Sequence, residues 1–324
     1  MKKSIILILC ALILFGCTRG KEKNDNIVII YSSAEEYRNE EFSRLLDEKF
    51  PQYKIIIEYM PTGDQAAKLL TEGNSTNADI SVDMEMGYYD KLSSIMANTS
   101  SYEKEEYLEG IKDPNDKFLP IYVNSGCIAI NKTVIQEKGL SIPTTYSDLL
   151  KDEYKGLIAM PDPKSSGTGY MFFKSLVNTL GEDEAIDYFK LLSNNILQFT
   201  SSGSGPVNLL VQKEVAIGLA MTGQVITEIN KGENLECLFF EEGAPRSIYG
   251  IGLVDSKKDD PAVQEVFQYF VETLIPNDKE KFFPEKIYKN IDFEVENYPI
   301  NINYANMGNN TSMEKERLLN LWPN

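Results

Sequence analysis

Short apolar stretches alternate with amphipathic stretches over most of the chain, and this pattern predicts an α/β fold. The segment NIVIIYSS reads as a strand, and the helix after it carries Phe42, Leu45, Leu46 and Phe50 on one side. KIIIEYM and ADISVDM are two more predicted strands, with the helical segment QAAKLLTEG between them. Strands and helices that alternate at this spacing are typical of a parallel sheet covered by helices.

The alternation starts afresh after an extended apolar segment near residues 119–130. KGLIAM, ILQFT and VAIGLAM are predicted strands, each followed by a loop and a helix, and LECLFFEE and RSIYGIGLV are two more strands. A second extended apolar segment lies near 245–254. Two connections between two α/β blocks indicate an inserted domain and a cleft that closes by hinge bending. We predict lobe 1 at 27–120 plus 252–324 and lobe 2 at 121–251.

The N-terminus is predicted to be an export signal. Two lysines precede an apolar run, Ser4 to Phe15, which is too short to span a bilayer as a stable helix. The run ends in LFGC, which resembles the lipobox of bacterial lipoproteins and implies that Cys17 is lipidated. We predict a signal peptide at 1–16 and a lipid-anchored tether at 17–26, on the outer face of a bacterial membrane (cell surface or periplasm). The alternative is an uncleaved hydrophobic N-terminus.

Composition narrows the function classes. The formal charge of −17 repels nucleic acid, so we expect no nucleic-acid partner, and any anionic ligand must be held by local dipoles. The sequence has no histidine, which is the commonest general base and zinc ligand, so an enzyme is disfavoured and no cofactor or metal site is predicted. Cys127 and Cys237 are compatible with a disulfide or with two buried thiols.

Four loops combine hydroxyl groups with glycines or free backbone amides directly before a predicted helix. The first turn of a helix leaves backbone N–H groups unpaired and carries a partial positive charge, so it attracts oxyanions. Ser and Thr also cap helices where no ligand binds, which gives each loop a purely structural interpretation. SSGTG and SSGSG hold more hydroxyls than one cap requires, and their glycines let the backbone approach a ligand. The four loops contain Ser32-Ser33, Thr62-Gly63, Ser165–Thr168 and Ser201–Gly205.

Several segments together resemble one family of transport proteins. VIIYSSAEEY, NSGCIAINK, AMPDPKSSGTGY, TSSGSGPVNLL and YANMGNN, in this order, resemble the bacterial ABC-transporter solute-binding proteins of the ferric-binding-protein class. The resemblance covers residues 27–324. It implies a type 2 periplasmic-binding-protein fold, in which two α/β lobes joined by a two-crossover hinge close on a solute. It also implies ABC permease membrane subunits as partners, and we expect a monomer with no enzymatic activity.

The resemblance points to a phosphorus compound as the solute. Ferric members generally place two adjacent tyrosines after the strand that corresponds to VAIGLA, where this chain has Met221-Thr222-Gly223-Gln224. Tyr88-Tyr89 is the only adjacent pair, and we favour a surface or packing role for it. The loops SSGTGY and TSSGSGP resemble the branch that takes 2-aminoethylphosphonate and hexose phosphates. We predict a small anionic solute, a phosphonate or a sugar phosphate, with ferric iron or another metal as the alternative.

The same resemblance implies which residues contact the solute. The residues expected at the phosphorus-bound oxygens or beside them are Ser32, Ser33, Thr62, Gly63, Ser125, Ser165, Ser166, Gly167, Thr168, Ser202, Gly203 and Ser204. Those expected at the organic part or the anion are Thr222, Gln224, Arg246 and Tyr249. A salt bridge at the rim or hinge is an equal alternative for Arg246. Glu35 and Glu36 are candidates to face an ammonium group, although glutamate is also favourable near a helix N-terminus for dipole reasons alone.

Overall fold

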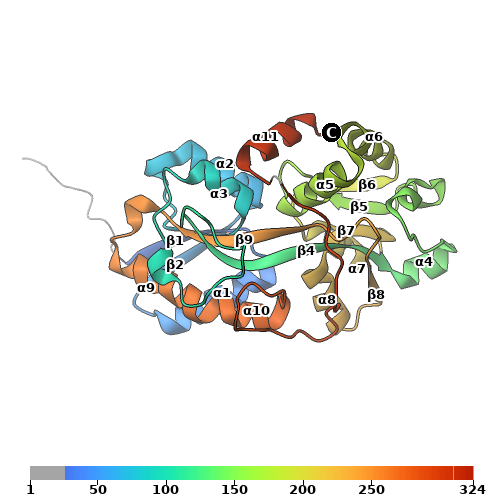
Figure 1. Cartoon of the computed structure of the whole chain (residues 1–324). Coiled ribbons are helices and arrows are strands. Elements are labelled where there is room, and N and C mark those ends of the chain that lie inside the picture. Colours follow the sequence, from blue (N-terminus) through green and yellow to red (C-terminus); the bar gives the residue numbers. More distant parts are fainter. Residues whose placement is uncertain (1–25, 309, 324) are drawn as a thin grey trace, which may run out of the picture.

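The computed structural model describes residues 26–308 and 310–323 and shows a mixed α/β protein with two lobes (Figure 1). The predicted signal peptide and Cys17 fall within residues 1–25, outside the described residues. Within the described ranges, no helix is long and apolar enough to cross a membrane. The mixed α/β arrangement with two lobes agrees with the predicted fold class.

One mixed sheet runs through both lobes in the order β2-β1-β3-β9-β4-β7-β5-β6, with β8 beside β4. Strands β1, β2 and β3 are parallel in the first lobe, and β5, β6 and β7 are parallel in the second. All the strands expected from the apolar runs are present. Their bounds are β1 (Ile27–Ser32), β2 (Lys54–Tyr59), β3 (Ile80–Glu85), β4 (Leu119–Asn131), β5 (Ile158–Pro161), β6 (Ile196–Thr200), β7 (Ile217–Met221), β8 (Leu235–Leu238) and β9 (Arg246–Leu253).

Helices cover both faces of the sheet in each lobe, with α2 and α3 opposite α1, α9 and α10 in the first and α5 and α6 opposite α7 and α8 in the second (Figure 1). A π-helical turn, Phe270–Leu274, joins α9 to α10. The α-helices are α1 (Glu36–Lys49), α2 (Thr62–Glu72), α3 (Met86–Leu92), α4 (Lys132–Lys138), α5 (Gly167–Leu180), α6 (Glu182–Leu192), α7 (Gly205–Val211), α8 (Thr222–Asn230), α9 (Pro261–Tyr269), α10 (Ile275–Phe282) and α11 (Ser312–Leu321). Short 3₁₀ turns occupy Gly73–Ser75, Ser100–Tyr102, Tyr146–Leu150, Asp152–Tyr154 and Asp255–Lys257.

Strands β4 and β9 connect the lobes. The first half of β4, Leu119–Ser125, pairs with β9, and the second half, Gly126–Asn131, pairs with both β7 and β8. Every residue of β4 is buried, because this strand lies in the middle of the sheet and is covered in both lobes. The predicted divisions at 120/121 and 251/252 lie within these two crossing strands, and we keep them as a proposal.

The last helix contacts both lobes. Trp322, directly after α11, is buried in the second lobe, with its ring centroid 5.0 Å from that of Phe173 and 5.1 Å from that of Phe189. On the first-lobe side, Glu316 of α11 forms an ion pair with Lys91 of α3 at 2.7 Å. Residues 252–324 were predicted as part of lobe 1, but α11 thus also packs on lobe 2. Trp322 therefore has a packing role.

Candidate functional site

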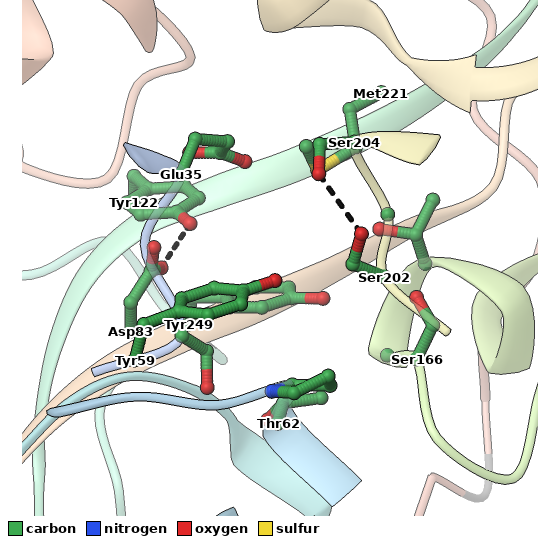
Figure 2. Close-up of a pocket in the computed structure, with 15 residues that line it drawn as sticks. Glu35, Tyr59, Thr62, Asp83, Tyr122, Ser166, Ser202, Ser204, Met221 and Tyr249 are labelled. Carbon is green, nitrogen blue, oxygen red and sulfur yellow. Dashed lines mark hydrogen bonds between the residues drawn. The ribbon is translucent and has the colours of Figure 1, made fainter. Parts of the chain in front are cut away.

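A cavity lies between the lobes (Figure 2). Each of the six parallel strands contributes residues at or just after its carboxyl end, which is where open α/β sheets place their ligands. The first lobe contributes Ser33, Glu35, Tyr59, Pro61, Thr62 and Asp83; the second contributes Ser166, Gly167, Thr168, Ser202, Gly203, Ser204 and Met221; the crossing strands contribute Tyr122 and Tyr249.

The second-lobe wall consists of the two hydroxyl-rich loops. Ser166 caps α5 by accepting a hydrogen bond from the backbone N–H of Gly169 at 3.4 Å, so one hydroxyl has the structural role that a cap requires. The hydroxyls of Ser202 and Ser204 lie 2.9 Å apart and face the same cavity (Figure 2). Thr168, in the first turn of α5, adds a further hydroxyl to the wall. The two loops therefore converge.

Gly167 shows how closely the lobes and crossing strands meet at this wall. A Cβ atom at this position would lie 2.4 Å from the Tyr249 hydroxyl oxygen and 3.1 Å from carbon atoms of Thr62 and Glu85. Real Cβ atoms do not come so close to other atoms, so only glycine fits here. The glycine brings the start of α5 against β9 and against two residues of the first lobe.

The first-lobe wall is acidic and has a buried cation behind it. The guanidinium nitrogens of Arg38 lie 2.8 Å from Glu35, 2.5 Å from Asp83 and 2.6 Å from Asp278, and Arg38 is 1% exposed. One positive charge thus faces three carboxylates. Tyr122 donates a hydrogen bond to Asp83. Burial raises the pKa of Asp83 to about 6, although the neighbouring Arg38 opposes this shift.

This charged cluster was largely missed in the sequence, yet two signals pointed to it. Arg38 precedes Phe42 by four residues and Leu46 by eight, so it lies on the apolar, buried face of α1. Asp83 lies near the carboxyl end of the strand ADISVDM. Its backbone has φ 63° at an irregularity in the pairing with β9, a conformation that Asp adopts more readily than most residues. A buried cation and a strand-end carboxylate are both typical of functional sites.

Three tyrosines complete the cavity. The rings of Tyr122 and Tyr249 stack with centroids 5.4 Å apart and an interplanar angle of 7°. Tyr59 extends from the end of β2 and is half exposed. Burial raises the pKa of Tyr59, Tyr122 and Tyr249, so all three phenols are protonated at neutral pH.

Of the predicted contact residues, the cavity brings together Ser33, Thr62, Ser166, Gly167, Thr168, Ser202, Gly203, Ser204 and Tyr249. Three others lie beside it. The Ser32 hydroxyl donates to Asn39 at 2.7 Å, and the Ser165 hydroxyl donates to the carbonyl oxygen of Ser201 at 2.9 Å. The backbone N–H of Gly63 donates to the carbonyl oxygen of Ser165 at 3.0 Å, which joins the lobes next to the cavity.

Ser125 and Arg246 lie on the other face of the crossing strands. Each is three residues from a cavity tyrosine on its own strand, Tyr122 or Tyr249, and side chains alternate between faces with a period of two. The Ser125 hydroxyl donates to Glu285 at 2.8 Å. The Arg246 guanidinium lies 4.6 Å from the centre of the Tyr304 ring, so this cation contacts an aromatic ring and does not line the cavity.

Thr222 and Gln224 lie in the first turn of α8, and both are buried. Gln224 lines a second, wider cavity, which adjoins the first because Glu35, Tyr59, Ser202 and Ser204 line both. Tyr88 and Tyr89 are buried in the first-lobe core away from both cavities, as the predicted packing role requires. Among the described residues, no group of three or more His, Cys, Asp or Glu side chains is arranged to hold a metal ion.

Residues 81–283, more than half of the chain, match the family described as "Bacterial extracellular solute-binding protein". The chain belongs to this family. Its members are solute-binding receptors of ABC import systems, so the partners of this solute-binding protein are a small solute and a membrane permease. The family and the fold are those of binding proteins.

Solved structures with the same fold include proteins with different ligands. The solute-binding protein is similar to the periplasmic binding protein P5PA, with a TM-score of 0.79 and 21% identity over 92% of this chain and 98% of that one. It is similar to AfuA from Actinobacillus pleuropneumoniae with exogenous fructose-6-phosphate bound, with a TM-score of 0.78 and 22% identity over 91% of this chain and 97% of that one. It is also similar to the ferric binding protein from Campylobacter jejuni, with a TM-score of 0.71 and 17% identity over 91% of this chain and 98% of that one. These likenesses support the fold, and the solute of this protein is a separate question.

Proposed function

We propose that this solute-binding protein captures a small phosphorus-containing organic anion, a phosphonate or a sugar phosphate, and delivers it to the permease. The observation that carries the proposal is that the SSGTG and SSGSG loops face one cavity, with Ser166, Thr168, Ser202 and Ser204 in its wall. Phosphonate and phosphate groups have three oxygens that accept hydrogen bonds. Hydroxyls and backbone amides from two loops match such a group.

Local dipoles attract the anion, whereas the negative net charge of the protein repels it. The cavity lies at the N-terminus of the fourteen-residue helix α5, whose unpaired N–H groups and dipole favour an anion. A hydrogen bond to a charged group contributes about 1.5–3 kcal/mol. Micromolar affinity requires about 8 kcal/mol net. A handful of such bonds from both loops is therefore sufficient after the cost of ordering the side chains.

Lobe closure is the proposed mechanism. The anion binds to the second-lobe loops, and the remainder of the solute contacts Tyr59, Thr62 or Glu35 of the first lobe. A ligand that contacts both lobes binds the closed form more tightly than the open form and so shifts the population toward closure. The bond between Gly63 and Ser165 joins the lobes beside the cavity and belongs to this closed form.

Ferric iron or another metal is the second candidate, because Tyr59, Tyr122 and Tyr249 line the cavity together with Glu35 and Asp83. Phenolate and carboxylate oxygens are suitable ligands for a hard cation. Three observations favour the phosphorus compound. Arg38 already occupies both carboxylates, Tyr122 donates to Asp83, and burial raises the pKa of the tyrosines, which opposes phenolate formation.

A thermal-shift screen separates the two candidates. The purified protein is heated with 2-aminoethylphosphonate, glucose 6-phosphate, inorganic phosphate or ferric citrate. We expect an organic phosphorus compound to raise the melting temperature with no new visible absorbance. A coloured tyrosinate complex with ferric citrate, and no shift with the phosphorus compounds, would reject the proposal in favour of the metal.

We also propose that the protein is a monomer anchored through lipid on Cys17. Both expectations come from the sequence, since residues 1–25 are outside the described ranges. In cells, the wild-type protein is expected in the membrane fraction, and a Cys17→Ser variant is expected to lose that association. Recovery of both proteins in the membrane fraction would contradict the anchor, and light scattering at the mass of a dimer would contradict the monomer.

A further inference from the structure

The two walls of the cavity differ in charge. Glu35, Asp83 and Tyr122 lie on one side, opposite Ser166, Ser202 and Ser204 on the other (Figure 2). The first-lobe side has an excess of negative charge, because Arg38 balances only one of the three carboxylates that contact it. The second-lobe side has hydroxyls and backbone amides and carries no charged side chain.

The adjoining wider cavity extends the acidic wall outward. Glu35, Glu36, Glu40 and Glu228 line it, and within the described part of the chain no lysine or arginine lines either cavity. Two like charges about 4 Å apart near a protein surface repel by roughly 4 kcal/mol, so a purely anionic solute is disfavoured on this side.

The side-chain oxygen of Gln224 is a second, independent observation, because it lacks a hydrogen-bond donor in the described part of the chain. Its side chain lines the wider cavity and is only 5% exposed, and its Oε1 atom has no hydrogen-bond partner among the described residues. Buried acceptors without a donor are rare because each costs about 1–3 kcal/mol. A ligand that donates hydrogen bonds from this side would satisfy it.

From these observations we propose that the natural solute is a zwitterion: a phosphorus oxyanion held by the second-lobe loops, and a protonated or quaternary amine held by the acidic wall. This inference rests on the proposed function and specifies the substrate class. Glu35 is the main counter-charge, since one of its carboxylate oxygens bonds to Arg38 and the other has no bond among the described residues. Tyr59, which is half exposed, offers a ring face that attracts a cation by about 0.5–2 kcal/mol.

A zwitterionic solute also explains how the protein binds an anion although, among the described residues, no lysine or arginine lines the site. A net-neutral solute brings its own cation to the acidic wall, so the repulsion of the carboxylates becomes an attraction. The acidic lining at Glu36 and Glu40 attracts the same group as the solute enters, whereas Glu228 already forms an ion pair with Lys231 at 2.9 Å. Arg38 remains buried behind the wall, where it holds Glu35 and Asp83 in place.

Calorimetry with five probes tests the inference: O-phosphoethanolamine, phosphocholine, glycerol 3-phosphate, choline and inorganic phosphate. We expect at least one of the two phosphorylated amines to bind at least tenfold more tightly than glycerol 3-phosphate, which has a similar size and no amine. Glycerol 3-phosphate binding as tightly as both amines would overturn the inference and leave the proposed function standing. No binding by either phosphorylated amine would also overturn the inference, and the proposed function would then depend on the thermal-shift screen. Choline binding as tightly as phosphocholine would overturn both, because the phosphorus group would then contribute nothing.

Variants of the acidic wall give a second measurement. Glu35→Gln is expected to reduce the preference for the amine over glycerol 3-phosphate at least fivefold, because it removes the main counter-charge. Asp83→Asn is expected to change the preference in the same direction, because it also removes a carboxylate charge from the wall. Asn accepts the same backbone conformation as Asp83, so the fold is kept. Glu48→Gln is the matched control: it lies on α1, the helix that Glu35 caps, is 64% exposed in its side chain and is expected to leave the preference unchanged. Unchanged preference in both wall variants would overturn the inference.

Discussion

Lys315 of α11 donates a hydrogen bond to the carboxylate of Glu85 at the end of β3, and both side chains are buried. The Lys315 ammonium also lies 3.8 Å from the ring centre of Tyr88 in the first lobe and 4.2 Å from that of Tyr170 on α5 in the second. This ion pair lies directly behind the cavity, because the backbone N–H of Glu85 donates to Thr62, which lines it. The last helix thus stabilises the contact between the lobes.

Lys315→Met is predicted to destabilise the protein by roughly 3–5 kcal/mol, since it leaves the buried charge of Glu85 without its partner. Urea unfolding measures the change. Lys91→Met is the matched control, because it breaks the ion pair with Glu316 of the same helix, whose side chain is 62% exposed; a loss below about 1 kcal/mol is expected. Equal losses in the two variants would contradict a special role for Lys315.

Gly63→Ala is predicted to weaken solute binding without removing any solute contact. A Cβ atom at Gly63 would lie 2.7 Å from the carbonyl oxygen of Lys164 and 2.9 Å from that of Ser165, both in the other lobe. The variant therefore disfavours the closed form. Calorimetry with 2-aminoethylphosphonate or glucose 6-phosphate is expected to show lower affinity, and small-angle scattering with solute is expected to show a larger radius of gyration than for the wild type. Normal affinity and closure would show that this contact is not part of the closed form.

The Asp83 carboxyl predicts a pH dependence of stability. Its pKa is raised by burial to about 6, so the folded state binds this proton more tightly than the unfolded state does. Its contribution to stability is therefore greatest near pH 4 and is lost as the pH rises through 6. The free energy of unfolding of the wild type minus that of Asp83→Asn is expected to rise by roughly 2–3 kcal/mol from pH 7 to pH 4.

The comparison with Asp83→Asn removes the contributions of distant groups. The groups that face Asp83 are Arg38, Glu35 and Asp278 of the ion cluster and Tyr122, and all four are present in both proteins. A difference in unfolding free energy that stays constant, or falls, on acidification would contradict the raised pKa.

Cys127 and Cys237 are free thiols on adjacent strands, β4 and β8, with their sulfur atoms 3.2 Å apart. We expect oxidised glutathione to convert them to a disulfide by thiol–disulfide exchange, which releases two molecules of reduced glutathione. Intact mass should fall by the mass of two hydrogen atoms, and stability should rise by about 2–4 kcal/mol because the bridge closes a long loop. A Cys237→Ser variant should show neither change. Two thiols that still react with maleimide in denaturant after this treatment would contradict the expectation.

Much of the fold follows from local patterns in the sequence. Each parallel strand is a short apolar run, and each loop on the ligand side begins where that run ends. The sequence therefore predicts Ser166 and Ser202 at the cavity. Their convergence is a property of parallel sheets, in which the carboxyl ends of the strands lie at one edge.

The remainder depends on contacts between distant parts of the chain. Arg38 meets Asp278 across a separation of 240 residues, and no local pattern pairs them. Ser125 and Arg246 were predicted from the family resemblance to contact the solute, but strand alternation turns them to the other face. The contact of α11 with both lobes likewise depends on Lys315 meeting Glu85, which are 230 residues apart.

The most direct test of the central claim is calorimetry on wild type and on the double variant Thr168→Val/Ser204→Ala, titrated with 2-aminoethylphosphonate and glucose 6-phosphate. The account predicts that whichever compound binds the wild type loses roughly tenfold or more in affinity, because two hydroxyl donors to the phosphorus oxygens are gone. Thr179→Val, on the same helix as Thr168 but bonded to the backbone of Ser175, should bind as the wild type does. Unchanged affinity in the double variant would contradict the claim.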